Sequence, residues 1–327
     1  MRECVKVEAN ARLHLGFFDL NGGLGRRFGS LGLAIDQPTT KLSIARSAQP
    51  SCEGPEHQRV AKYIEIFCNA FRLPNTYAVN VQQAIPAHAG LGSGTQLALA
   101  VAAALRQLEG YAADATADAI LLHRGARSGA GAALFCDGGL VVDGGHAEGG
   151  ASAAKNVPPI VTRLPFPDDW RIILVFDDHI ESVHGEAERQ AFAQLPVFSS
   201  ADAGEICRSV LMQALPAAIE RDLESFGAAI ARIQRILGAY FAPAQGGSGF
   251  TSHRVGALMQ KLGAEGAHGI GQSSWGPTAF AFAQNAAEAD RLVERVAAAA
   301  AQSNLRLLVC RGANHGAVVK YQDNDHQ

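Results

Sequence analysis

The part of the sequence that points most directly to chemistry is a run rich in glycine and hydroxyl side chains, Gly90-Leu91-Gly92-Ser93-Gly94-Thr95. Its three glycines carry no side chain, so another group can approach the backbone closely. The alanine-rich segment that follows predicts a helix over 93–109, and the first N–H groups of a helix attract anions because they lack partners within the helix. These six residues are therefore predicted to bind phosphate. The alternative is a flexible loop that only caps the helix.

Two common phosphate motifs do not match this run. A P-loop needs a lysine directly after its last glycine, but Gly94 is followed by Thr95. The dinucleotide fingerprint needs Gly-x-Gly-x-x-Gly, whereas this run has Gly-x-Gly-x-Gly. The alternating pattern of residues 77–82 before the run predicts a strand. The resulting order of strand, glycine loop and helix favours an anion site.

Three arginines in glycine-rich surroundings are candidates for contacts with an anionic substrate. Arg26 and Arg27 lie in a glycine-dense stretch, residues 19–32, which we expect to be irregular, and Arg127 is followed by Ser-Gly-Ala-Gly. A guanidinium group matches the planar arrangement of oxygens in a phosphate or a carboxylate. The alternative is that these side chains are solvated at the surface.

Two aspartates beside glycine-rich backbone, Asp19 and Asp143, are candidate ligands for Mg²⁺, which prefers oxygen donors. Either residue fits a turn or a helix cap equally well. The histidines do not have the spacing of a zinc site.

A second glycine-rich loop, expected over 266–276, contains four polar or aromatic candidates in a row, Gln272, Ser273, Ser274 and Trp275. The first three side chains can donate hydrogen bonds to a phosphate or a carboxylate. The indole can stack on an aromatic ligand, or it can belong to the core as most tryptophans do.

Composition limits the class of protein. The chain has 327 residues, 48% of them hydrophobic and 18% charged, which is enough for two globular domains, and we place the boundary near residue 165. The net charge of −3 gives no reason to expect nucleic-acid or membrane partners. The six cysteines are scattered, as expected for reduced thiols in a cytoplasmic protein.

The elements that must position these residues alternate between helices and strands, which predicts an α+β protein. Strands are expected within residues 1–45 and over 77–82, and helices over 57–72, 93–109 and 115–124. A hairpin is expected with arms at 132–135 and 140–143. The second half is predicted to contain strands over 171–176, 278–282, 305–309 and 317–319, with helices over 217–237 and 286–301.

Three blocks together resemble the motifs of the GHMP kinase superfamily. Residues 86–94, Pro-Ala-His-Ala-Gly-Leu-Gly-Ser-Gly, resemble its second motif, residues 11–16 its first, and residues 271–278 its third. Four segments are similar to one family within it, the β-ribofuranosylaminobenzene 5′-phosphate synthases of methanopterin biosynthesis. These segments are residues 25–32, 124–129, 138–145 and 271–277.

The resemblance implies a GHMP-type fold, with a domain like ribosomal protein S5 domain 2 over 1–165 and a ferredoxin-like domain over 166–327. It implies a phosphoribosyltransferase in which a ring carbon of p-aminobenzoate or 4-hydroxybenzoate attacks phosphoribosyl pyrophosphate (PRPP), with loss of CO2 and pyrophosphate. It also implies Mg²⁺ as cofactor and a homodimer.

The same resemblance implies roles for the candidate residues. The glycine run and Ser128 would bind the diphosphate of PRPP, and Ser274 and Trp275 the aromatic acid. Catalytic contacts would come from Arg26, Arg27, Arg127, Gln272 and Ser273.

Two other functions fit the same blocks. Many GHMP kinases, which transfer a phosphate from ATP to a small alcohol, carry a catalytic aspartate shortly after a Ser-Gly pair. Here Ser128-Gly129 is followed by Ala-Gly-Ala-Ala, so that carboxylate is missing. A non-catalytic binding protein of the same fold would show eroded motifs, but the glycine run and its arginines are intact.

Overall fold

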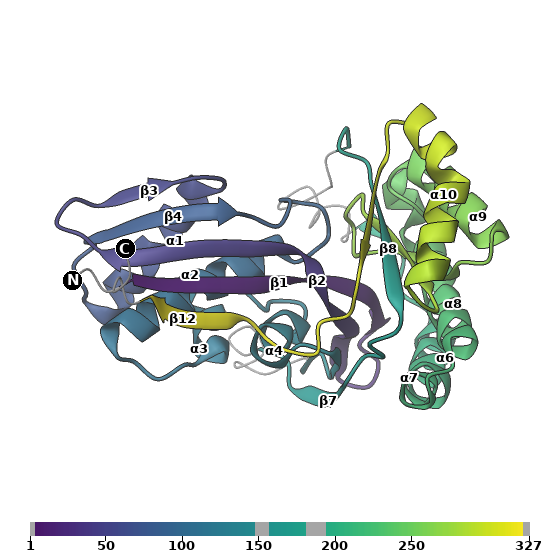
Figure 1. Ribbon diagram of the computed structural model, residues 1–327. Helices are drawn as coiled ribbons and strands as arrows, with labels where there is room; N and C mark the ends of the chain where they lie inside the picture. Colours follow the sequence, from purple (N-terminus) through teal and green to yellow (C-terminus); the bar gives the residue numbers. More distant parts are fainter. Residues whose placement is uncertain (1–3, 148–156, 181–193, 323–327) are drawn as a thin grey trace.

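The computed structural model describes residues 4–147, 157–180 and 194–322. It confirms an α+β architecture with two sheets (Figure 1). The larger sheet has the order β12-β1-β2-β4-β3, with β5 and β6 paired to β2 and β7 to β5. Its strands are β1 (Cys4–Asp19), β2 (Arg26–Arg46), β3 (Ser51–Glu53), β4 (Tyr77–Gln83), β5 (Leu140–Asp143), β6 (His146–Ala147), β7 (Ile160–Leu164) and β12 (Val318–Gln322).

Helices α1 (His57–Phe71), α2 (Ser93–Glu109) and α4 (Ala130–Asp137) pack with the larger sheet, and α3 (Ala115–Leu121) packs on α2 and α4. The α2 helix is buried over most of its length, and its small alanines allow its backbone to lie close to β1 and β2. Glycines flank it on both sides, because Gly92 and Gly110 adopt the left-handed conformation (φ 75° and 74°).

The smaller sheet has the order β11-β8-β10-β9, and all of its neighbours are antiparallel. Its strands are β8 (Arg171–Phe176), β9 (His268–Gln272), β10 (Ala279–Ala283) and β11 (Arg306–Cys310). One face packs with α9 (His253–Ala264) and α10 (Ala286–Gln302). The other face packs with α8 (Leu223–Phe241) and its neighbours, α6 (Ser200–Ser209), the π-helix η1 (Val210–Ala214), α7 (Leu215–Glu220) and the 3₁₀ helix η2 (Ala242–Gln245).

One hydrophobic core joins the two sheets. It contains Leu13 and Leu15 of β1, Phe282 of β10 and Phe226 of α8. Candidate functional residues lie on β1 and on the loop between β9 and β10, and both of these segments meet at this core. The core therefore fixes the two halves of the candidate site against each other.

Four sequence-based expectations for secondary structure are wrong. Residues 132–135 belong to helix α4 rather than to a hairpin arm, and residues 26–32 belong to β2 rather than to an irregular loop. Gly32 lies where a Cβ would be 2.9 Å from the Cβ of Ala130, so this glycine permits α4 to approach the strand. Residues 268–272 form β9, and the helix expected over 217–237 ends at Glu220 and restarts at Leu223, because Asp222 caps the new helix.

The domain boundary near residue 165 stays a prediction. The chain does pass from β7 of the larger sheet to β8 of the smaller sheet between Leu164 and Arg171. However, β12 returns to the larger sheet and pairs with β1, with Cys4 opposite Gln322. The larger sheet is therefore built from both ends of the described chain (Figure 1).

Truncating an aromatic residue in the shared core should destabilise the whole protein. Phe226 is fully buried and contacts the rings of Trp170 and Phe282, each at a centroid distance of 5.3 Å. We expect Phe226→Ala to lower the free energy of unfolding by about 3–5 kcal/mol in urea denaturation, because the cavity cannot collapse fully. Leu24→Ala, at a residue that is 93% exposed, should change it by less than about 0.5 kcal/mol. Equal effects of the two variants would contradict this description of the core.

Candidate active site

The glycine run forms the start of helix α2. Gly92 is the N-cap residue, and its carbonyl accepts hydrogen bonds from the N–H groups of Thr95 and Gln96. No side chain caps this end of the helix. The positive end of the helix dipole is therefore not offset by a capping side chain, which suits an anion.

The glycines of this run make room for protein side chains. The sequence predicted instead that they let a phosphate approach the backbone. A Cβ on Gly92 would lie 2.7 Å from Cγ of Arg12. A Cβ on Gly94 would lie 2.8 Å from Arg59 Nη2 and 3.0 Å from Arg124 Nη1. Missing side chains thus allow three guanidinium groups to gather around the helix start.

A cavity opens beside the helix start, with a space of about 1090 Å³ that includes its mouth. We call it the cationic cavity, because Arg12, Arg124 and Arg127 line it and none of its lining residues is acidic. The lining comprises Arg12, His14, Phe17, Thr95, His123, Arg124, Gly125, Ala126, Arg127, Ser128, Gly131 and Ser274. Such a wall favours a polyanionic ligand.

Two of these arginines are held in place by neighbouring groups. Arg12 Nη1 donates to the carbonyl oxygen of Gly90 at 3.1 Å. Burial lowers the pKa of Arg12 to about 10, so it remains charged at neutral pH. Arg124 donates to the hydroxyl of Tyr63 through Nη2, and its buried Nε has no hydrogen-bond partner. A bound anion would satisfy such a donor.

His14 lies on β1 between the arginines and the β9–β10 loop. Its backbone N–H donates to Ser273 Oγ at 3.0 Å, and this hydroxyl donates to the carbonyl oxygen of Gly90 at 2.7 Å. The ring contacts Phe17 at a centroid distance of 4.3 Å, and its buried Nε2 has no hydrogen-bond partner. The imidazole is thus fixed at the cavity wall with one nitrogen unsatisfied.

The environment keeps His14 neutral. Burial is the main cause that lowers its pKa, to about 3, and the positive charges of Arg12 and Arg127 act in the same direction. At neutral pH the ring can donate one hydrogen bond and accept another without carrying charge.

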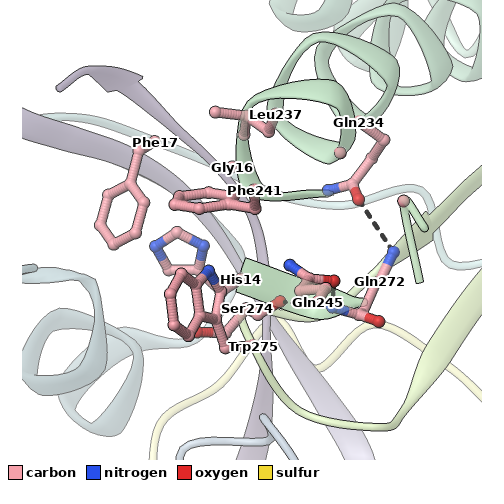
Figure 2. Close-up of a pocket in the computed structure, with 12 residues that line it drawn as sticks. His14, Gly16, Phe17, Gln234, Leu237, Phe241, Gln245, Gln272, Ser274 and Trp275 are labelled. Atoms are coloured by element: carbon pink, nitrogen blue, oxygen red, sulfur yellow. Dashed lines mark hydrogen bonds between the residues drawn. The ribbon is translucent and has the colours of Figure 1, made fainter. Parts of the chain in front are cut away.

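A second, narrower cavity adjoins His14, with a volume of about 30 Å³ inside an open space of about 360 Å³ that includes its mouth (Figure 2). We call it the amide cavity, because three glutamine side chains line it among apolar groups. Its lining comprises His14, Gly16, Phe17, Gln234, Leu237, Gly238, Phe241, Gln245, Gly249, Gln272, Ser274 and Trp275. His14, Phe17 and Ser274 line both cavities, so the two spaces adjoin at these residues.

The three predicted arginines do not line one common cavity. Arg127 lines the cationic cavity, as the sequence suggested, and also a neighbouring cavity that Arg27 lines. Arg27 Nε donates to the carbonyl oxygen of Leu20. Arg26 donates to the carbonyl oxygens of Gly144 and Gly145, at 2.8 and 2.6 Å, and lines neither cavity. The paired arginines therefore do not act as one cluster.

The predicted metal ligands have structural partners. Asp19 Oδ1 accepts from the backbone N–H groups of Asn21 and Gly22, as in a turn. Asp143 is fully buried; its carboxylate accepts from Ser30, from Ser128 and from the backbone of Gly145. Within the described ranges, no group of three His, Cys, Asp or Glu side chains could hold a metal ion. These aspartates do not fit a protein-bound Mg²⁺.

The predicted residues of the β9–β10 loop differ in access. Gln272 and Ser274 line the amide cavity. Trp275 also lines it, although it is only 5% exposed and packs edge-to-face on Phe241 at a centroid distance of 5.1 Å. Ser273 is fully buried and joins β1 to Gly90, so it positions other groups.

The remaining predicted residues support the helix start. Thr95 and Ser128 line the cationic cavity, and Ser128 Oγ donates to Asp143 at 2.7 Å. Leu91 is buried in the core, so it holds the loop rather than contacting a ligand through its side chain. Gly90 packs against the backbone of residues 273 and 276, where a Cβ would collide.

Sequence reasoning missed several residues of the two cavities. Arg12 and His14 stood in a recognised block but received no role, although their spacing of two on a strand puts both on one face. Arg124 lies in the segment 124–129, which resembles the family, but it likewise received no role. Gln234 and Gln245 gave no sequence signal, because only the packing of α8 and η2 brings them to the cavity.

The neutral state of His14 should make the protein sensitive to acid. Since its pKa falls from 6.5 to about 3 on folding, the unfolded chain binds a proton between these values and the folded chain does not. Unfolding free energy should therefore decrease below pH 6.5, by up to about 1.4 kcal/mol per pH unit from this residue. Urea denaturation at pH 7.5 and pH 5 should show a smaller loss for His14→Gln than for the wild type. Equal losses would contradict the assignment.

Comparisons with known proteins agree with this architecture. Models of the GHMP kinase N-terminal and C-terminal domains match residues 58–139 and 214–302. A homoserine kinase from Cytophaga hutchinsonii has a TM-score of 0.69 at 16% identity, covering 98% of each chain. L. major mevalonate kinase has a TM-score of 0.69 at 15% identity, covering 94% of this chain and 96% of its own. At these identities the likeness concerns the fold. No helix in the described segments is long and apolar enough to cross a bilayer.

Relatives with higher identity share one name, β-ribofuranosylphenol 5′-phosphate synthase. The protein from Archaeoglobus fulgidus is 35% identical over 289 residues, which cover 85% of this chain and 87% of the relative. That from Methanocaldococcus jannaschii is 33% identical, covering 84% and 88%, and that from Methanothermobacter thermautotrophicus is 29% identical, covering 95% and 97%. The chain belongs to the β-ribofuranosylphenol 5′-phosphate synthase family of the GHMP kinase superfamily.

Proposed function

We propose that this protein transfers the ribosyl 5-phosphate group of PRPP to a para-substituted benzoate, with loss of CO2 and pyrophosphate, in tetrahydromethanopterin biosynthesis. The name shared by its relatives describes a phenol that carries ribofuranosyl phosphate, which supports 4-hydroxybenzoate as the acceptor. The acceptor p-aminobenzoate would give the corresponding aniline.

The observation that carries the proposal is the pair of adjoining cavities with different chemistry. The cationic cavity suits PRPP, whose phosphates are polyanionic, and the amide cavity suits a flat ring with a polar substituent. His14, Phe17 and Ser274 line both, so two substrates could meet at these residues. A reaction between a diphosphate and an aromatic acid needs this arrangement.

The cationic cavity would stabilise the leaving pyrophosphate. Arg12, Arg124 and the start of helix α2 present positive charge and N–H donors that are held before the reaction begins. As the C1′–O bond breaks, its electron pair moves to the pyrophosphate, and these groups offset the growing negative charge. In this proposal Arg12 and Arg124 have the role that the sequence analysis predicted for Arg26 and Arg27.

The amide cavity would hold the benzoate so that the ring carbon bearing the carboxylate lies toward His14. The ring carbon that bears the carboxylate bonds to C1′, and the C–CO2 electron pair restores the aromatic ring as CO2 leaves. The step needs no oxidant and moves no proton. Because His14 is neutral, it adds no positive charge beside C1′, where positive charge develops.

The cavity argues against the rival kinase function. Transfer of a phosphate to an alcohol is helped by a carboxylate that accepts the hydroxyl proton. No acidic residue lines the cationic cavity, and residues 130–133 form the first turn of α4 without one.

The direct test is incubation of the purified protein with PRPP, Mg²⁺ and each acid. We expect equal amounts of CO2 and pyrophosphate. Consumption of ATP with a small alcohol, and no CO2 from either acid, would contradict the proposal and favour the kinase.

Removing a guanidinium group from the cationic cavity should weaken catalysis through the diphosphate. Arg12→Met keeps most of the side-chain volume but loses the charge, so we expect kcat/KM for PRPP to fall about 10- to 100-fold. Pyrophosphate should bind more weakly in calorimetry by a similar factor. Arg235→Met, at an exposed position outside both cavities, is the matched control and should match the wild type. Unchanged pyrophosphate binding in Arg12→Met would remove Arg12 from the site.

Magnesium would enter as a complex with PRPP, because the described carboxylates do not fit a protein-bound ion. We therefore expect EDTA to abolish turnover without changing the melting temperature of the free protein. A fall in melting temperature with EDTA alone, reversed by Mg²⁺, would show instead that the protein itself holds the metal.

A further inference from the structure

We propose that Gln245 is a specificity-determining residue, whose amide nitrogen donates a hydrogen bond to the para substituent of the acceptor. This arrangement favours a hydroxyl over an amino group at that position. The inference rests on the proposed function, since it concerns the aromatic acid of the same reaction.

Two backbone groups fix the orientation of the Gln272 amide. The N–H of Thr251 can only donate, and it donates to Gln272 Oε1 at 2.6 Å. The carbonyl of Ser274 can only accept, and it accepts from Gln272 Nε2 at 3.1 Å. Both contacts place the oxygen and the nitrogen of this amide in the same way.

The orientation of Gln245 follows from that of Gln272. Gln272 Nε2 donates to Gln245 Oε1 at 3.4 Å, and the hydroxyl of Thr251 donates to the same oxygen at 3.5 Å. The Gln245 nitrogen must then point away from these donors. Figure 2 shows it on the side of the cavity where His14 lies. Within the described residues, no hydrogen-bond acceptor contacts this nitrogen.

The third glutamine of the cavity is already occupied. Gln234 Nε2 donates to the carbonyl oxygen of Leu15 at 2.8 Å, and its Oε1 accepts from the N–H of Gln272 at 2.8 Å (Figure 2). Both polar ends of Gln234 thus serve the protein. Gln245 is left as the glutamine with an amide N–H directed at a ligand.

The position of the reaction decides which end of the acceptor meets Gln245. The ring carbon that bears the carboxylate must lie near the boundary of the two cavities, where His14 and Ser274 are shared, because this ring carbon bonds to C1′. The para substituent then points into the amide cavity, whose lining includes Gln245.

An N–H donor distinguishes the two substituents. A phenol oxygen accepts a hydrogen bond readily. The nitrogen of an aromatic amine is a poor acceptor, because its lone pair is delocalised into the ring. With an amine in this place, the amide N–H would face two further N–H donors and lose its hydrogen bond.

The test compares 4-hydroxybenzoate with 4-aminobenzoate in the wild type and in Gln245→Met, which keeps the length of the side chain and removes the donor. The ratio of kcat/KM for 4-hydroxybenzoate to kcat/KM for 4-aminobenzoate should fall about tenfold in the variant, because one hydrogen bond is lost. A change in this ratio is independent of the intrinsic reactivities of the two acids, which cancel. Gln245→Asn, whose amide is withdrawn by one methylene, should lower the ratio as well and serves if the methionine variant is unstable.

A second readout needs no turnover. The ratio of the dissociation constants of the two acids, measured by calorimetry without PRPP, should change in the same direction. Gln82→Met makes the same chemical change at an exposed position of β4 and should leave both ratios unchanged.

The outcomes separate this inference from the proposed function. Unchanged ratios in both Gln245 variants, with an active wild type, would overturn the role of Gln245 and leave the proposed function standing. If neither acid reacts in the wild type, the proposed function fails. The ratio of the dissociation constants then still decides about Gln245.

Discussion

The carbonyl oxygen of Gly90 is the point on which the arrangement of the site depends. It accepts from Arg12 of β1 and from Ser273 of the β9–β10 loop, and Ser273 in turn accepts from the backbone of His14. Segments from three distant parts of the chain, one of them from the smaller sheet, thus share one acceptor. Gly90 itself must be a glycine, because its φ is 79° and a Cβ would collide with the backbone of Ser273.

Gathering positive charge around this contact has an electrostatic consequence. Arg12, Arg59 and Arg124 approach the start of α2, where the helix dipole is also positive. Two groups offset part of this repulsion, since Arg59 pairs with Glu56 at 2.7 Å and Arg124 lies over the ring of Tyr63. The remaining positive potential would be relieved by a bound polyanion. Burial is the main cause of the low pKa of His14, and the nearby charge of Arg12 lowers this pKa further.

The sequence predicted those parts of the protein that depend on local pattern. Helix α2, its glycine start and the strands β8 and β10 follow from periodicity and from glycine, and each lies close to its expected bounds. It failed where a glycine serves packing: Gly32 suggested an irregular loop but permits α4 to contact β2. Gln272 was predicted, but Gln234 and Gln245 could not be found, because they meet Gln272 only after the helices have packed. Arg12 and His14 lie in a block that was identified from the sequence, but the pattern of a strand does not show which of its faces lines a cavity.

The return of β12 to the larger sheet bears on the order in which the protein is made. Residues 318–322 pair with residues 4–8, so β1 finds this partner only after residues 9–317 have been synthesised. Until then one border of β1 offers free N–H and C=O groups to any passing extended chain. A cell that makes this protein must protect the nascent sheet during synthesis, or complete the last steps before encounters with other strands become frequent.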